Sequence, residues 1–321
     1  MFLERIRKMN EKKKKNLRIS MYIACIVLLS LSVVMVIVFG KSKPKAEVSK
    51  NPVVIATTFS AYDWARNVLK DTNGIELLYL VDSSADMHSY TPSASDIVKY
   101  KNASLVIAIG GESEEWIEDV GLDESKVLKL ISCVEVLQED GEDGEVDEHI
   151  WLSLKNAEVC TGVIADRFSI LDKENAETYK ENAKQYRESL ALLEKRYEDA
   201  VGKSEAKVLL FADRFPFAYL VNDYGISHYA AFNGCSAETE ASFETVAFLA
   251  GKVRELGLPA VCTVGNPDIA KSVVRDSKMD GVEIVEFDAL QSVTMTQARD
   301  ASYLQVMENN LAALNRALGV E

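Results

Sequence analysis

The chain has 321 residues, with 36 basic and 50 acidic side chains and a formal net charge of −14 at pH 7. The first 20 residues hold eight Lys or Arg and two Glu, so the remainder carries a net charge of −20. This acidic body would repel phosphate groups, which argues against a nucleic-acid partner, and it would attract cations.

The N-terminal segment predicts a membrane anchor. Residues 21–39 form an apolar run without a charge, and about 20 such residues span a bilayer as a helix. We predict a basic cytoplasmic segment at 1–19, a transmembrane anchor at 20–40 and a tether at 41–52, with the main domain outside the cell membrane. A cleaved signal peptide and a lipoprotein signal are the alternatives, but Cys25 lies near the beginning of the run rather than after it.

The first half of the body alternates short apolar runs with helical patterns. The run at 105–109 is apolar at every position, which is typical of a strand buried on both faces of a parallel sheet. The alternation predicts a parallel α/β lobe over 53–170. Its strands are expected at 53–57, 76–81, 105–109 and 127–131. Its helices are expected at 63–69, from a cap at Ser93 or Ser95 through Tyr100, and from 114 to 118.

A long helix is predicted at 171–203. Residues 172–201 contain no Gly or Pro, and apolar or aromatic side chains recur every three or four positions. Asp172 is the expected N-cap and Gly202 the expected end, which gives a helix of ~45 Å. A coiled coil for a partner is one alternative. We interpret the helix as a rigid backbone that joins two lobes, because more α/β pattern follows it.

The remaining residues, 204–321, predict a second lobe of the same kind. Strands are expected at 208–211, 261–264 and 282–287, and helices at 242–256, 269–276 and 303–318. The fold class is therefore α/β, with two parallel-sheet lobes joined by a long helix and preceded by one transmembrane helix.

Two of the three histidines, His88 and His149, lie in polar contexts in the first half of the body. His149 follows two carboxylates, Asp147 and Glu148, and neutral imidazole is a common metal ligand whose basicity carboxylates tune. We predict that the two histidines meet across a cleft and hold a divalent metal. The acidic segment 139–145 is expected to be a mobile loop that raises the local cation concentration.

Acidic residues in the second half supply further candidate ligands. Ligands bind outside the carboxyl ends of strands in open α/β sheets, and Asp213 and Asp288 follow predicted strands there. Glu238 and Glu240 are additional candidates, although their segment also suits a helix N-terminus. His228 lies in an apolar-polar alternation and is expected to be structural.

Several motifs resemble the zinc- and manganese-binding solute-binding proteins of ABC importers. The motifs are 86–92, which contains His88, 103–111 with Glu115-Trp116, 147–152, 219–226 and 240–242. The resemblance implies two lobes joined by a long helix, with metal in the cleft and His88 and His149 as the first two ligands.

The resemblance also implies a third and a fourth ligand. The third falls near Asp213, and since Arg214 cannot bind a cation, Asp213, Glu238 or Glu240 must supply it. Asp288 matches the fourth ligand, although residues 289–291 depart from the family's Pro-Leu-Gly.

The implied function is the extracytoplasmic substrate-binding component of an ABC importer. It would capture a divalent transition metal, zinc first and manganese second, and deliver it to a permease and its ATPase, as a monomer. A surface metal sensor or adhesin is one alternative, and a zinc hydrolase another. We expect no enzyme, because the sequence contains neither H-E-x-x-H nor G-x-S-x-G.

Overall fold

The computed structural model describes residues 51–81, 87–138, 146–232, 234 and 240–320. The predicted cytoplasmic segment, transmembrane anchor and acidic loop at 139–145 lie outside the described residues, as does Glu238. Within the described ranges, no helix combines the length and the apolar character needed to cross a membrane.

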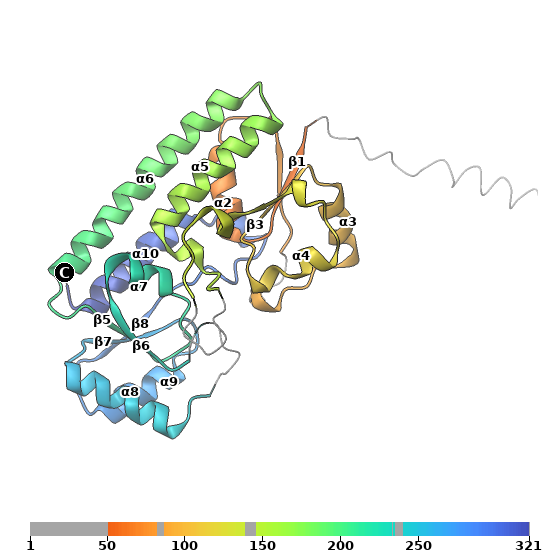
Figure 1. Ribbon diagram of the computed structural model, residues 1–321. Helices are drawn as coiled ribbons and strands as arrows, with labels where there is room; N and C mark the ends of the chain where they lie inside the picture. Colours follow the sequence, from red (N-terminus) through yellow and green to blue (C-terminus); the bar gives the residue numbers. More distant parts are fainter. Residues whose placement is uncertain (1–50, 82–86, 139–145, 233, 235–239, 321) are drawn as a thin grey trace, which may run out of the picture. The chain divides into compact units, whose positions relative to one another are not determined.

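The first lobe contains a four-stranded parallel sheet with the strand order β2-β1-β3-β4 (Figure 1). All four residues of β3 are buried, because the strand lies between β1 and β4 and is covered on both faces. The predicted helix at 114–118 is a 3-10 turn followed by a single helical turn. The elements are β1 (Val53–Ala56), α2 (Phe59–Val68), β2 (Glu76–Tyr79), α3 (Ala94–Asn102), β3 (Leu105–Ala108), α4 (Trp116–Asp119) and β4 (Val127–Lys129).

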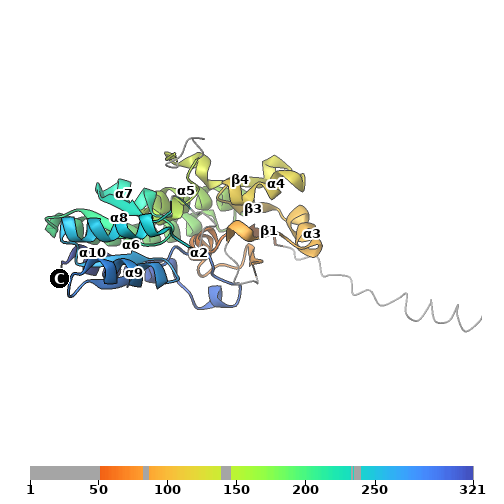
Figure 2. The same cartoon turned by 90° about the horizontal axis from the view of Figure 1, so that it is seen from below.

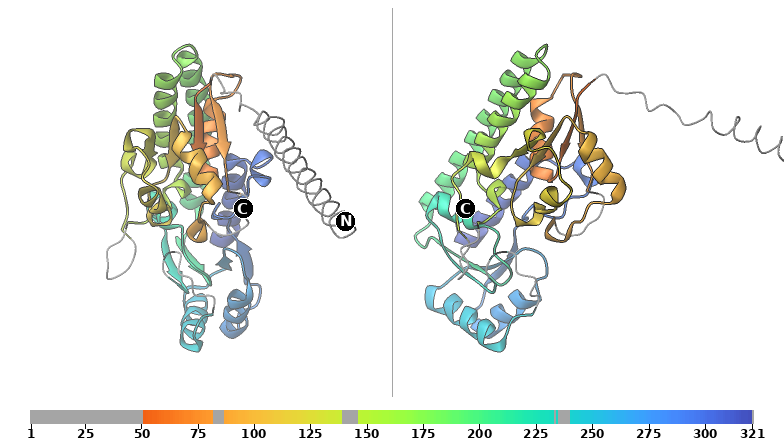
Figure 3. Two further views of the ribbon diagram at one scale, coloured as in Figure 1. Left: turned by 90° about the vertical axis from the view of Figure 1, so that its right-hand side faces the viewer. Right: turned by 45° about the vertical axis from the view of Figure 1, so that its right-hand side comes forward.

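Two long helices, α5 (Leu154–Leu171) and α6 (Ala176–Lys203), pack against each other, and Figures 1 and 3 show them side by side. The apolar and aromatic residues that recur every three or four positions are all buried in α6, so the predicted long helix is confirmed. They are Tyr179, Ala183, Tyr186, Leu190, Leu193, Tyr197 and Val201. Its predicted N-cap is wrong. Asp172 ends α5 and accepts hydrogen bonds from Asn175 and Tyr179, so it shapes the turn between the helices.

The second lobe repeats the architecture, with a four-stranded parallel sheet in the order β6-β5-β7-β8. Two parallel-sheet α/β lobes were predicted and are confirmed. Helix α6 contacts α5 and α2 on the first-lobe side and α7 and α10 on the second. The elements are β5 (Val208–Phe211), α7 (Ala218–Tyr224), β6 (Ser227–Ala230), α8 (Phe243–Leu256), β7 (Ala260–Thr263), α9 (Asp268–Ser277), β8 (Glu283–Glu286) and α10 (Tyr303–Leu318).

The chain that follows β8 returns to the first lobe before α10 begins. Tyr79 donates to the carbonyl of Val293 at 2.6 Å, and the amide of Met295 donates to the carbonyl of Val81. Tyr79 is the last residue of β2, and Val81 lies two residues beyond it. These bonds place the loop after β8 next to the loop that carries His88. In Figure 2, α3 and α4 of the first lobe and α8 and α9 of the second lie at opposite ends of residues 51–321.

Candidate metal centre

His149 is held in one orientation by the residues around it. Its side chain is fully buried, and Asp147 Oδ1 lies 2.8 Å from both the backbone nitrogen and Nδ1 of His149. The carbonyl of Asp147 is in turn fixed by the hydroxyl of Tyr219 at 2.7 Å. A carboxylate that accepts from Nδ1 leaves Nε2 with its lone pair, so His149 presents Nε2 toward His88.

His88 is oriented in the same way by a second carboxylate. It lies in a 3-10 turn at Met87–Ser89, and its Nδ1 is 3.0 Å from Glu148 Oε1. The other oxygen of Glu148 accepts from the amide and the hydroxyl of Ser113 at 3.1 and 2.8 Å. Burial opposes ionisation of Glu148, but its bonds to His88 and Ser113 outweigh burial and lower its pKa. Glu148 therefore stays ionised and holds the ring of His88 with its Nε2 toward His149.

Gly111 makes room for Glu148. A Cβ atom at position 111 would lie 2.1 Å from Oε2 and 2.2 Å from Cβ of Glu148. Any other residue would push that side chain away from His88. Gly111 therefore serves the site, because its missing side chain leaves the space that Glu148 occupies.

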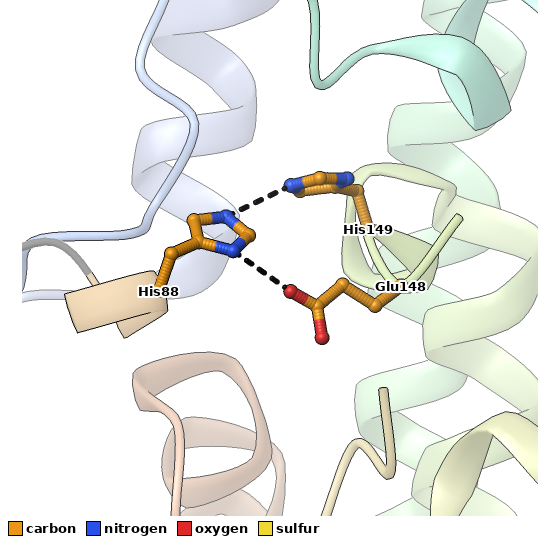
Figure 4. Close-up of side chains that lie close together, drawn as sticks. All are labelled: His88, Glu148 and His149. Atoms are coloured by element: carbon orange, nitrogen blue, oxygen red, sulfur yellow. Dashed lines mark hydrogen bonds and ion pairs between the residues drawn. The ribbon is translucent and has the colours of Figure 1, made fainter. Parts of the chain in front are cut away.

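The two imidazoles converge on one point (Figure 4). Their Nε2 atoms are 3.4 Å apart, and one ligand atom each from His88, Glu148 and His149 lies within 4.8 Å of the others. Two nitrogens that each lie about 2.05 Å from a tetrahedral zinc ion are about 3.3 Å apart. The separation of the imidazoles therefore suits a shared metal ion.

The amide of Gln291, from the second lobe, completes this group. Its Nε2 lies 3.0 Å from Nε2 of His88 and 2.8 Å from Nε2 of His149. In the sequence, Gln291 stands out only as part of a departure from the family pattern, and Glu148 only as one of two carboxylates beside His149. Their roles depend on contacts across the fold, for which the local sequence carries no pattern.

The three acidic candidates are not part of the group that the structure brings together among its described residues. Oδ2 of Asp213 accepts from the hydroxyl of Thr263 and the amides of Val264 and Gly265, so this carboxylate shapes the loop after β7. Asp288 is exposed and accepts from the amide of Leu290 at 2.8 Å. Glu240 is exposed.

His228 lies outside the group, in β6. Its ring stacks on Phe215 with a centroid separation of 3.9 Å and an angle of 9°. This contact agrees with the structural role expected from the sequence.

Glu114 is a buried carboxyl close to Glu148. It is 5% exposed and accepts from the amide of Gly110 at 2.6 Å, while its other oxygen, Oε1, has no hydrogen-bond partner. Burial raises the pKa of Glu114 from 4.5 to about 7. The folded chain therefore binds a proton that the unfolded chain releases, and stability falls as the pH rises from 4.5 toward 7.

We expect Glu114→Gln to stabilise the metal-free chain in a pH-dependent way. The amide cannot ionise but keeps an acceptor for Gly110. The gain in free energy of unfolding should reach about 3 kcal/mol at pH 8 and be much smaller at pH 5. Urea unfolding at both pH values measures it, with the exposed Glu112→Gln as the matched control. An equal gain at both pH values would contradict the raised pKa.

The fold and the site together define a class of two-lobed proteins with a histidine pair between the lobes. The model of the ZnuA family, "Zinc-uptake complex component A periplasmic", matches residues 54–317, so the chain belongs to this family. The resemblance seen in the sequence motifs is thereby confirmed.

Two curated relatives and one solved structure illustrate the similarity. The chain is 29% identical over 286 residues to the zinc-binding lipoprotein AdcA of Streptococcus pneumoniae serotype 4, covering 84% of this chain and 56% of that protein. It is 25% identical to the high-affinity zinc uptake system protein ZnuA of Bacillus subtilis, covering 84% and 88%. The crystal structure of the Zn(II)-bound ZnuA-like domain of S. pneumoniae AdcA matches with a TM-score of 0.69 and 26% identity, covering 84% of this chain and 99% of that domain. The chain thus spans only about half the length of AdcA.

Proposed function

We propose that this chain is the extracytoplasmic substrate-binding component of an ABC importer and that its substrate is zinc. The observation that carries the proposal is the pair of Nε2 atoms 3.4 Å apart, each directed by a carboxylate on the opposite ring nitrogen. Membership of a zinc-uptake family and the zinc-binding names of the relatives support it. The chain would bind and release the ion unchanged, without catalysis.

Zinc fits the donors better than manganese does. Imidazole suits zinc, whereas carboxylates and water suit manganese, and zinc binds more tightly at a mixed site. The nitrogen pair provides two imidazole donors, and the carboxylates of Asp147 and Glu148 are engaged with the far nitrogens of the rings. Manganese is therefore the weaker substrate of this proposal.

His88 and His149 are the ligands that we retain from the sequence prediction. Asp213, Asp288 and Glu240 remain candidates only for a state in which their loops rearrange, because none of them belongs to the described group. We also propose that the N-terminal segment anchors the chain in the cell membrane. The chain would then act outside the membrane as a monomer and pass zinc to a permease powered by an ATPase.

One zinc ion should bind tightly to each chain. The reason is that one pair of imidazoles lies between the lobes, and exposed carboxylates bind zinc only weakly. Elemental analysis of the purified full-length chain after dialysis gives the stoichiometry, and competition against a chelator gives the affinities for zinc and manganese. Two equally tight zinc ions per chain, or tighter binding of manganese than of zinc, would refute the proposal.

A further inference from the structure

Gln291 follows β8 in a loop whose backbone is bent toward the first lobe. Leu290 has a φ of 61°, a left-handed conformation that costs a non-glycine residue about 1–2 kcal/mol. The carboxylate of Asp288 accepts from the amide of Leu290 at 2.8 Å and so stabilises the bend. Immediately after it, the carbonyl of Gln291 accepts from the amide of Met87 at 3.1 Å. The bend turns Gln291 toward the loop that carries His88.

Residues from other elements hold this loop rigidly. The side chain of Asn310, in α10, accepts from the amide of Asp288 at 2.9 Å and donates to its carbonyl at 2.8 Å. The indole of Trp151 donates to the carbonyl of Ala289 at 2.9 Å. These bonds fix the side chain of Gln291 beside the two imidazoles, and the residue is only 7% exposed. A group held in this way is preorganised for a ligand.

The hydrogen-bond partners of the two imidazoles determine what this amide does. Asp147 and Glu148 take the Nδ1 protons, so the lone pairs of both Nε2 atoms face each other. Two lone pairs at 3.4 Å repel unless a donor or a cation lies beside both. The NH₂ group of Gln291 has two protons, and it lies 3.0 and 2.8 Å from the two nitrogens.

We propose that Gln291 is a direct ligand of the metal ion at this site, an inference that rests on the zinc-binding function proposed above. Without a cation, the amide nitrogen donates to both imidazoles. When a cation binds between them, rotation of the terminal amide by about 180° replaces the nitrogen with Oε1, which then coordinates the ion. The same side chain thus stabilises the metal-free site and supplies an oxygen to the metal-bound one.

The neutral amide has a consequence for metal selectivity. Manganese and calcium prefer sites rich in carboxylate oxygens, whereas zinc accepts two imidazoles and one neutral oxygen. The carboxylate of Asp213 is occupied by the loop after β7, and that of Asp288 by its own loop. Gln291 is therefore the residue through which the second lobe selects zinc over harder cations.

The test compares Gln291→Ala and Gln291→Glu with the parent in the full-length chain. Chelator competition gives the affinities for zinc and manganese, and the visible absorption of bound cobalt(II) reports the coordination. Gln291→Ala removes a coordinating oxygen and should weaken zinc at least about 10-fold, the lower end of the range for residues that only orient a ligand, and it should change the cobalt spectrum. Gln291→Glu supplies a carboxylate and should shift the ratio of zinc to manganese affinity toward manganese by at least about tenfold.

Controls separate this inference from the proposed function. Gln305→Ala removes an exposed glutamine from α10 and should behave like the parent, and circular dichroism checks that each variant folds. If the parent binds no zinc, or if His149→Ala binds it as the parent does, the proposed function fails. If His149→Ala loses zinc but both Gln291 variants match the parent in affinity, selectivity and spectrum, this inference is overturned and the proposed function stands. Tighter zinc binding by Gln291→Ala would also overturn it, since the amide would then only compete with the metal.

Discussion

Replacing His149 with alanine should weaken zinc binding by at least about 100-fold. Changes in residues that merely orient a ligand typically cost 10–100-fold, so removal of a direct ligand should cost at least as much. His149 is fully buried and Asp147 fixes its ring, so its Nε2 needs no reorganisation to bind the ion. His88→Ala should fall in the same class. Competition of zinc against a chelator measures each affinity in the full-length chain.

Asp147→Asn should give an intermediate loss, roughly 10–100-fold. Its amide can donate to Nδ1 of His149, which favours the tautomer with the proton on Nε2, where the metal must bind. His228→Ala is the matched control, because that histidine stacks on Phe215 in β6 outside the group. Thermal unfolding of the metal-free variants shows whether they fold. If folded His149→Ala kept the zinc affinity of the parent while His228→Ala lost it, the site assigned to His88 and His149 would be wrong.

Asp63→Ala should destabilise the metal-free chain by about 3 kcal/mol, because it leaves the partly exposed Arg66 and two buried donors without their acceptor. Asp63 is fully buried in α2 and pairs with Arg66. It also accepts from the amide of Tyr303, in α10, and the hydroxyl of Tyr186, in α6, both at 3.2 Å. Arg66 itself donates at 2.7 Å to the carbonyl of Ala298. The network joins the first lobe to the long helix and to the chain that returns from the second lobe.

Urea unfolding of the full-length chain measures this loss. The matched control is Asp276→Ala, because the carboxylate of Asp276 pairs with Arg275 on the exposed surface of α9, where an ion pair contributes little to stability. Equal effects of the two substitutions would show that the buried network contributes no more than a surface pair.

The fold was predictable where local pattern decides it. Strands such as β3 and β7 are short apolar runs between turn residues, and the buried face of the 28-residue helix α6 repeats at helical spacing from Tyr179 to Val201. Prediction was weaker where the pattern is ambiguous. Asp172 suits either end of a helix, and only the packing of α5 against α6 places it in the turn between them.

The candidate site was predictable in part. His88 and His149 could be paired because each lies within a recognisable motif, and both belong to the group that the structure assembles. Asp213 and Asp288 also lie in loops after strands, as expected. The carboxylate of Asp213 bonds to amides of the loop after β7 and that of Asp288 to an amide of its own loop, which a position along the chain cannot reveal.

The sequence by itself determined the alternation of strands and helices in both lobes, the acidic charge of the body and the residue types able to bind a cation, but it did not predict α5, α7 or β6. The features it determined depend on composition and on periodicity along the chain. The tertiary structure alone decided which side chains meet. Glu148 reaches His88 because Gly111 leaves space beside β3, and Gln291 reaches both histidines because Leu290 takes a left-handed bend. Such contacts join segments up to 203 residues apart, so they depend on how the two lobes pack and on no local pattern.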